Sequence, residues 1–195
     1  FVDEFNAFAS HPTKQNIMWA SFSFSGESAE IYQIDAQNSD APMVSSIQLP
    51  SYERVRAILF DPTNPNRVSI TQGAKLYRSE HMGETWASIG NGLEDLDAME
   101  DSILQLKQNE INPNKLYISS TKGIYISEDA GQNWTQISSV FAHYIQPSNQ
   151  NETHLIAITH KTDFTDFSVH ISVDNGQNWK TIPNADFLYM ESSMP

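Results

Sequence analysis

Short hydrophobic runs along this chain are separated by short polar segments, and the hydrophobic runs predict β-strands. They are rich in β-branched and aromatic residues, and they end at clusters of Pro, Asn, Asp, Ser or Gly, a composition that is typical of strands separated by turns. The runs form four groups of four. They cover 5–9, 17–24, 31–34 and 43–49; 55–60, 67–71, 76–79 and 86–89; 103–106, 115–119, 123–127 and 134–137; 141–145, 153–159, 168–172 and 179–182.

One eight-residue stretch recurs between the third and fourth strands of three groups. It reads Ser-Glu-Asp-Ala-Gly-Gln-Asn-Trp at 127–134 and Ser-Val-Asp-Asn-Gly-Gln-Asn-Trp at 172–179, with a weaker copy, Ser-Glu-His-Met-Gly-Glu-Thr-Trp, at 79–86. We expect its key positions to be structural. They are Ser79, Gly83, Trp86, Ser127, Asp129, Gly131, Trp134, Ser172, Asp174, Gly176 and Trp179.

Each kind of residue in the stretch has a physical role in a tight turn. The side chains of Ser127 and Asp129 can accept hydrogen bonds from backbone N–H groups a few residues ahead. Gly131 supplies the positive φ that a side chain resists. Trp134 begins the returning strand and can bury about 150–250 Å² against the next sheet. The stretch therefore predicts a hairpin turn that serves folding rather than chemistry.

The spacing of this turn predicts the architecture. Its serines stand at 79, 127 and 172, so the separations are 127 − 79 = 48 and 172 − 127 = 45 residues. Periods of 40 to 50 residues in a strand-rich chain are typical of propeller blades. We therefore predict an all-β fold, a β-propeller of four-stranded antiparallel blades. The blades are expected at 1–50, 51–92, 99–140 and 141–183.

The two ends of the chain bear on how the ring closes. The first unit has no such turn, because residues 35–40 lack both the Gly and the Trp. At the other end, residues 184–195 include one more apolar run, which is either a closing strand or the start of a further blade. Isolated blades expose edges and faces. We expect these blades to belong to a larger propeller, with a closed four-bladed ring as the alternative. Because the chain begins at Phe1, we also expect a processed or excised piece.

Charge and composition exclude several classes of function. The formal net charge is −13 over 195 residues and there is no cysteine. Nucleic acids and anionic membrane surfaces need patches of Lys or Arg, so we expect no nucleic-acid partner. Disulfides and thiol chemistry are excluded, and no apolar run approaches the ~18 residues that a membrane span requires. We interpret the acidity as a solvated surface.

With its Ser-x-Asp-x-Gly-x-x-Trp stretches the sequence resembles the Asp-box, or bacterial neuraminidase repeat, proteins. That superfamily includes sialidases, xyloglucan-degrading glycosidases, sortilin receptors and photosystem assembly factors. The resemblance covers roughly 51–182 and is closest in style to the xyloglucanase and sortilin types, in which an Asp-Pro-x-Asn-Pro-Asn turn, here 61–66, precedes the box. It implies a propeller whose boxes lie at the outer rim, away from the central face where substrates bind.

The residues needed for catalysis in such proteins are mostly missing. A sialidase site needs three converging arginines, whereas Arg54, Arg56, Arg67 and Arg78 all lie in the second unit. A glycosidase needs two carboxylates about 5 to 9.5 Å apart. The candidates near the starts of inner strands, each of which we interpret as a solvated surface group, are Asp3, Glu4, Glu53, Glu100 and Asp101.

No metal or cofactor site is predicted. The six histidines have no spacing typical of zinc ligands, and no phosphate-binding loop is present. We expect Asp129 and Asp174 to hold turns rather than metals. The histidines are His11, His81, His143, His154, His160 and His170.

The best pointer to a ligand is a lengthened loop in the fourth unit. Residues 160–167 extend a hairpin, and long loops on a regular scaffold often carry binding residues. We predict Asp163, Phe164, Asp166 and Phe167 as a possible ligand loop. Other aromatic residues could stack on a sugar but are more typical of core. They are Trp19, Phe22, Phe24, Tyr52 and Tyr144.

These observations favour a secreted or cell-surface propeller that binds a glycan or a protein without catalysis. The first alternative is part of a polysaccharide-degrading, xyloglucanase-like glycoside hydrolase. The second is an intracellular assembly-factor scaffold. Two sequons, at 133–135 and 151–153, would carry glycans only in a eukaryotic secretory setting.

Overall fold

The computed structural model describes residues 4–23, 29–160 and 167–183, and every regular element in these ranges is a strand. Each predicted strand overlaps an observed one. The strands are β1 (Glu4–Ser10), β2 (Ile17–Ser23), β3 (Ala29–Asp35), β4 (Met43–Ile47), β5 (Val55–Phe60), β6 (Val68–Gln72), β7 (Lys75–Ser79), β8 (Ala87–Ile89), β9 (Ile103–Gln108), β10 (Leu116–Ser120), β11 (Gly123–Ser127), β12 (Thr135–Ser138), β13 (Tyr144–Pro147), β14 (Leu155–His160), β15 (Phe167–Ser172) and β16 (Lys180–Pro183).

These strands form four separate four-stranded antiparallel sheets, each in simple sequence order. We number them blade 1 (β1–β4) to blade 4 (β13–β16). This confirms the predicted all-β propeller blades. The described residues contain no helix that is long and apolar enough to cross a membrane.

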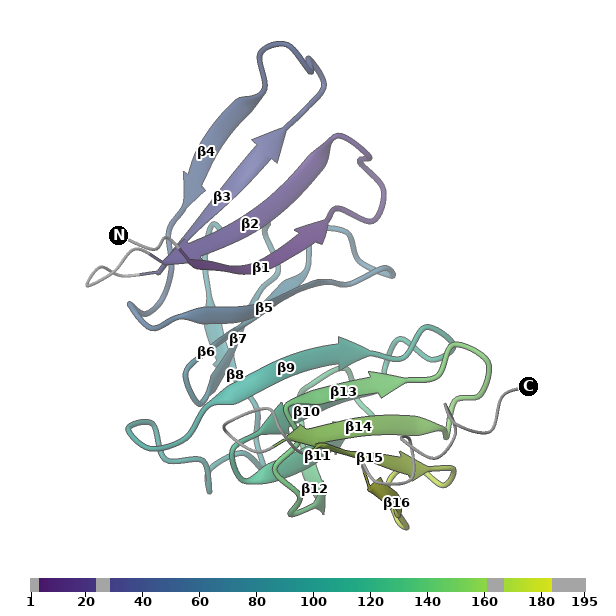
Figure 1. The fold of residues 1–195 in the computed structure, drawn as a ribbon. Helices are drawn as coiled ribbons and strands as arrows, with labels where there is room; N and C mark the ends of the chain where they lie inside the picture. The colour runs from purple at the N-terminus through teal and green to yellow at the C-terminus, as the bar shows by residue number, and fades with distance from the viewer. Residues whose placement is uncertain (1–3, 24–28, 161–166, 184–195) are drawn as a thin grey trace.

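The blades follow one another along an arc (Figure 1). Their first strands are the innermost, since β1 contacts β5, β5 contacts β9 and β9 contacts β13. Figure 1 shows blade 1 and blade 4 at opposite ends of this arc. Within the described ranges the four blades therefore form an open arc, and the closed four-bladed ring that was the alternative is not what these residues build.

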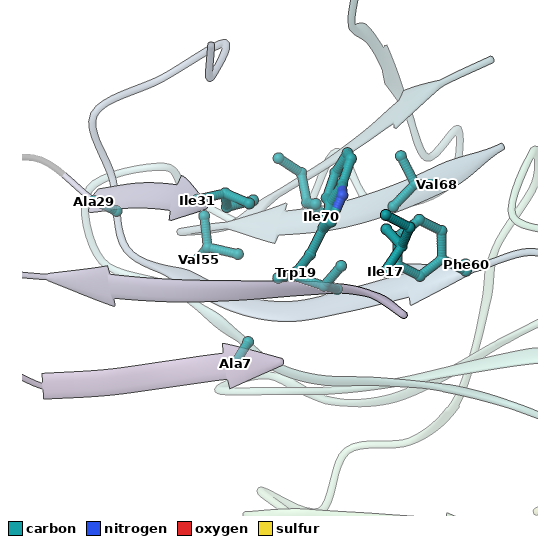
Figure 2. Packing of buried hydrophobic residues seen from close by; sticks show 10 residues of the cluster. Ala7, Ile17, Trp19, Ala29, Ile31, Val55, Phe60, Val68 and Ile70 are labelled. Carbon is teal, nitrogen blue, oxygen red and sulfur yellow. The ribbon is translucent and has the colours of Figure 1, made fainter. Parts of the chain in front are cut away.

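Three apolar cores hold the arc together, one between each pair of consecutive blades. Figure 2 shows the first, where Trp19 and Ile31 of blade 1 meet Val55, Phe60 and Ile70 of blade 2. The Trp19 indole is fully buried, and its ring centre lies 5.2 Å from that of Phe60 in an edge-to-face arrangement. Burying such rings supplies much of the stability of an interface of this kind.

The two ends of the arc leave apolar side chains uncovered. In blade 1, Phe5 is 56% exposed and Val44 is 58% exposed; in blade 4, Tyr144 is 53% exposed and Ile156 is 46% exposed. On inner blades the corresponding faces are covered by a neighbouring blade. The end blades thus present the same kind of face that forms cores elsewhere in the chain.

Candidate functional site

The recurring turn is held by its serine hydroxyl. In blade 3, Ser127 Oγ accepts hydrogen bonds from Gly131 N at 2.8 Å and Asp129 N at 3.4 Å, and donates one to Asp129 Oδ1 at 2.8 Å. Blade 4 repeats all three distances around Ser172. In blade 2, Ser79 Oγ accepts from His81 N and Gly83 N at 3.1 and 2.9 Å. In each of the three blades, therefore, a serine hydroxyl closes the same turn.

The aspartate then orders the end of the turn. Asp129 Oδ1 accepts from Gln132 N at 3.0 Å and Asn133 N at 2.9 Å, and Oδ2 accepts from Asn133 Nδ2 at 2.6 Å. Burial alone would raise the pKa of Asp129, but the hydrogen bonds, led by those from Asn133, outweigh it and place the pKa below its ordinary value. In blade 4, hydrogen bonds from Asn178 lower the pKa of Asp174.

The glycine of the turn is required by two independent constraints. Gly83, Gly131 and Gly176 have φ of 85°, 88° and 81°, in the region that disfavours side chains. A Cβ on Gly176 would also lie 2.4 Å from Ile137 Cδ1, and one on Gly83 would lie 2.7 Å from Ile47 Cγ2. Both contacts are with the preceding blade. The turn is thus a docking surface between blades as well as a reversal.

The tryptophan of the turn corrects one expectation. Trp86, Trp134 and Trp179 stand immediately before the outer strands, and each joins the core shared with the preceding blade rather than the next one. Trp134 is 5% exposed, and its Nε1 donates to Gly131 O at 3.1 Å. The direction follows from the turn itself, which rests on the preceding blade through its glycine.

A small cavity lies on the inner strands, away from the recurring turns. It measures about 140 Å³ and opens between β1, β5 and β9. Phe8, Arg56, Gln105 and Lys107 supply its aromatic and polar lining. The remaining lining residues are Ala7, Ala57, Ile58 and Leu106. We call this the axial cavity. No carboxylate lines it in the described part of the chain.

Three of the carboxylate candidates, Glu53, Glu100 and Asp101, do not line that cavity. Asp101 accepts a hydrogen bond from Thr121 Oγ1 at 2.7 Å and pairs with Lys122 Nζ at 3.1 Å; the Thr121 bond is the main reason that the pKa of Asp101 is lowered. Glu53 lies over Gly73, and Glu100 is exposed. Glu4 begins β1, and Asp3 lies outside the described residues.

The four arginines of blade 2 lie in different surroundings. Arg67 pairs with Asp61 and Glu80, both at 3.0 Å, and so links two turns. Arg78 is buried and donates to Ser69 Oγ and to Ala130 O of the next blade. Burial lowers the pKa of Arg78. Arg54 and Arg56 are exposed near the start of β5. Only Arg56 reaches the axial cavity.

The ligand loop of blade 4 is only partly described. Asp163, Phe164 and Asp166 lie outside the described residues, as does Phe24, while Phe167 begins β15 opposite His160. At the base of this loop the His143 and His160 rings stack with centres 3.4 Å apart. Burial and the neighbouring His160 lower the pKa of His143.

Of the remaining candidates, His170 and Trp19 lie in structural surroundings. His170 is buried between Thr159 Oγ1 and Thr181 Oγ1 at 3.1 and 3.0 Å. Trp19 belongs to the first core, whereas Tyr52 is 85% exposed. In the described residues no group of three metal-ligating side chains converges.

A larger cavity had no signal in the sequence. It measures about 520 Å³ and lies between the outer strands of blade 2 and the connector to blade 3. Leu76, Leu93 and Leu96 form its buried floor, with Lys75 and Glu94 among its polar lining residues. Residues of two blades and a connector meet there, so no local pattern could have indicated it.

Four-stranded antiparallel blades, joined in sequence order and carrying Ser/Gly/Trp turns before their outer strands, define an Asp-box β-propeller. Residues 74–188, more than half of the chain, match the family model described as "Sortilin, neurotensin receptor 3". The chain therefore belongs to the sortilin family. No curated protein matches it in sequence.

Solved structures show the same fold. An ancestral GH74 enzyme is 18% identical over 92% of this chain and 25% of its own, with a TM-score of 0.71. The GH74 xyloglucanase from Xanthomonas campestris is 13% identical over 98% and 41%, with a TM-score of 0.55. YCF48 bound to D1 peptide is 13% identical over 92% and 66%, with a TM-score of 0.50. The chain thus spans a quarter and about two fifths of the two GH74 proteins.

Proposed function

We propose that this chain is a non-catalytic binding platform whose ligand face is the axial cavity on the inner strands. The observation that carries the proposal is the lining of that cavity: one arginine, one lysine, a glutamine and an exposed phenylalanine, without a carboxylate among the described residues. Such a group of polar side chains at one small cavity can bind a polar or charged group of a ligand.

The cations favour a ligand that carries an anionic group. Arg56 and Lys107 line this cavity from neighbouring strands, in a chain whose net charge is −13. Guanidinium and ammonium groups bind carboxylates by charge-assisted hydrogen bonds. An acidic glycan and the carboxylates of a peptide both supply this chemistry. The peptide-bound state of YCF48 shows that a propeller of this fold can hold a peptide.

The hydrolase alternative has less support. A glycosidase needs one carboxyl group whose pKa is raised so that it can act as an acid. Asp101 has a lowered pKa and an ion pair with Lys122 instead. The likeness to GH74 enzymes is below 20% identity and concerns the fold.

The platform is proposed to be part of a larger propeller in a secreted or cell-surface protein. The apolar end faces around Phe5 and Ile156, together with the short span of the chain relative to the GH74 proteins, support further blades on both sides. The sortilin family match favours the extracellular location. An intracellular assembly role would instead require a partner complex inside the cell.

The test is a binding screen of the full-length protein against acidic glycans, neutral glycans and acidic peptides. We expect an acidic ligand, and we expect Arg56→Ala and Lys107→Ala each to weaken its binding by about tenfold, which corresponds to ~1.4 kcal/mol. Lys180→Ala, on the outer strand β16, is the matched control and should bind normally. Release of sugars from xyloglucan would favour the hydrolase, and unchanged binding by both cavity variants would contradict the proposed face.

A further inference from the structure

Three buried hydroxyl groups occupy the same position in three blades. Ser21 of β2, Thr71 of β6 and Ser119 of β10 are each three residues beyond the start of equivalent ladders, at Met18, Val68 and Leu116. Each residue is 0% exposed. None of the three hydroxyl oxygens has a hydrogen-bond partner among the described residues. A buried hydroxyl without a partner costs about 1–3 kcal/mol, so its appearance three times at one position calls for a partner.

A β-bulge lies directly beside each hydroxyl. The pairing of β1 with β2 shifts between Phe5 and Ala7, and that of β5 with β6 shifts between Val55 and Ala57. The pairing of β9 with β10 shifts at Ser119 and Ser120. One extra residue is thus inserted in each inner strand: Asn6, Arg56 and Leu104. A bulge leaves backbone groups of the extra residue outside the ladder.

Blade 4 differs at the equivalent position. Its ladder between β13 and β14 ends at the pair of Tyr144 and Ile158, so Ile158 stands where the other three blades have a hydroxyl, and the ladder does not extend to the place of the bulge. Blade 4 is the last blade of the arc, and Ile158 is only partly buried. The hydroxyl therefore occurs in the three blades in which this position is fully buried.

We propose that each bulge and its hydroxyl hold one internal water molecule, giving one site in each of blades 1, 2 and 3. An internal water needs two to four polar partners. The hydroxyl supplies one, and the backbone groups that the bulge leaves outside the ladder supply the others. The cross-strand neighbours of the three hydroxyls are Ala7, Ala57 and Gln105, which line the axial cavity. The waters therefore lie behind the wall of that cavity and keep the bulged strands in place.

The test combines a crystal structure of the full-length protein, at a resolution that shows ordered waters, with the isosteric variant Thr71→Val. We expect a water at all three bulges and none at Ile158. Thr71→Val should lose only the blade 2 water and lower Tm by about 2–4 °C, the shift for a loss of ~1 kcal/mol in a domain of this size. Thr71→Ser keeps the hydroxyl and should keep its water.

The opposite result is equally clear. If the hydroxyls have no partner, removing one relieves an unsatisfied group, so Thr71→Val would raise Tm and all three bulges of the parent protein would be dry. Either observation overturns the proposal. If Thr71→Val does not fold, the density of the parent and of Thr71→Ser decides the question.

Discussion

The turns of blade 2 and blade 3 differ in the residue between Ser and Gly, and the comparison separates what makes this turn from what stiffens it. Asp129 of blade 3 accepts three hydrogen bonds from the last part of the turn. Among the described residues, the exposed His81 ring of blade 2 has one such neighbour, Thr85 Oγ1, at 3.5 Å from its Nδ1. Both turns nevertheless share the serine bonds and the positive φ of the glycine. The Ser/Gly/Trp frame makes the turn, and the aspartate orders its end.

In blade 2 an arginine forms ion pairs with the turn. Arg67 forms ion pairs with Glu80 of the turn and with Asp61 of the neighbouring turn. These ion pairs join the two turns within one blade. In blade 3 the corresponding cation, Lys115, pairs with Glu128 at 3.7 Å but more closely with Glu152 of blade 4, at 2.6 Å. The same position therefore stabilises a turn in one blade and an interface in the next.

The tryptophans should show the largest difference between the two blades. Trp134 is 5% exposed, while Trp86 is only partly buried. We expect Trp134→Ala to lower the free energy of unfolding by ~3–5 kcal/mol through an unfilled cavity, and Trp86→Ala to lower it by less. Urea titrations of both variants measure this, and equal losses would show that burial of the ring is not what distinguishes the two turns.

Exchanging the central residues tests the role assigned to the aspartate. Asp129→Ala should cost about 2 kcal/mol, because the N–H groups of Gln132 and Asn133 lose a charged acceptor. His81→Asp should gain about 1 kcal/mol, because it introduces that acceptor into blade 2. His81→Ala is the control and should be nearly neutral. Loss of stability in His81→Asp would mean that the blade 2 turn cannot use an aspartate.

The first turns of the blades give a comparison that depends on pH. His11 Nδ1 accepts hydrogen bonds from Thr13 N and Lys14 N at 3.2 and 3.0 Å, as Asp61 Oδ1 and Asn109 Oδ1 do in blades 2 and 3. These bonds need a neutral ring. Burial, followed by the nearby Lys14, lowers the pKa of His11 below its usual 6.5.

Because the folded pKa is depressed, this turn stabilises the protein fully above pH 6.5. The contribution is lost as the pH falls through the lowered pKa. We expect urea midpoints of the parent to fall over this range, with the two hydrogen bonds contributing about 1 kcal/mol each. His11→Asn should flatten the fall, since an amide oxygen accepts the same bonds at any pH. An unchanged pH profile in His11→Asn would exclude His11 as the titrating group.

The smallest effect concerns the residue before the glycine. Met82 of blade 2 and Ala130 of blade 3 have φ of 53° and 58°, where blade 4 has Asn175. Asn tolerates this region better than other side chains. Ala130→Asn and Met82→Asn should each raise the unfolding free energy by about 0.5–1 kcal/mol, because the left-handed region costs Asn less than Ala or Met. A gain in stability in one blade alone would show that the Ser/Gly/Trp frame does not impose the same φ on both turns.

Much of the fold could be predicted because its signals are local. Runs rich in β-branched and aromatic residues, bounded by turn residues, indicated every strand. The turn chemistry of Ser127 and Gly131 operates within a few residues, and its repetition gave the blades. That Ala130 also adopts a positive φ was missed, because nothing in an alanine indicates it.

The candidate site could be predicted only in part. Arg56 was noted as one of four arginines, but nothing indicated that it meets Phe8 and Lys107, residues about 50 positions away on either side. The tryptophans were expected on the next sheet, whereas they pack on the preceding one.

The strands, their grouping and the chemistry of the turns thus follow from the order of the amino acids, because each depends on neighbours along the chain. The packing of the blades sets which blade faces meet, which inner-strand side chains share a cavity and which hydroxyls lie beside a bulge. Those outcomes depend on how twisted sheets dock on one another, and docking brings together residues whose separation in sequence carries no local pattern.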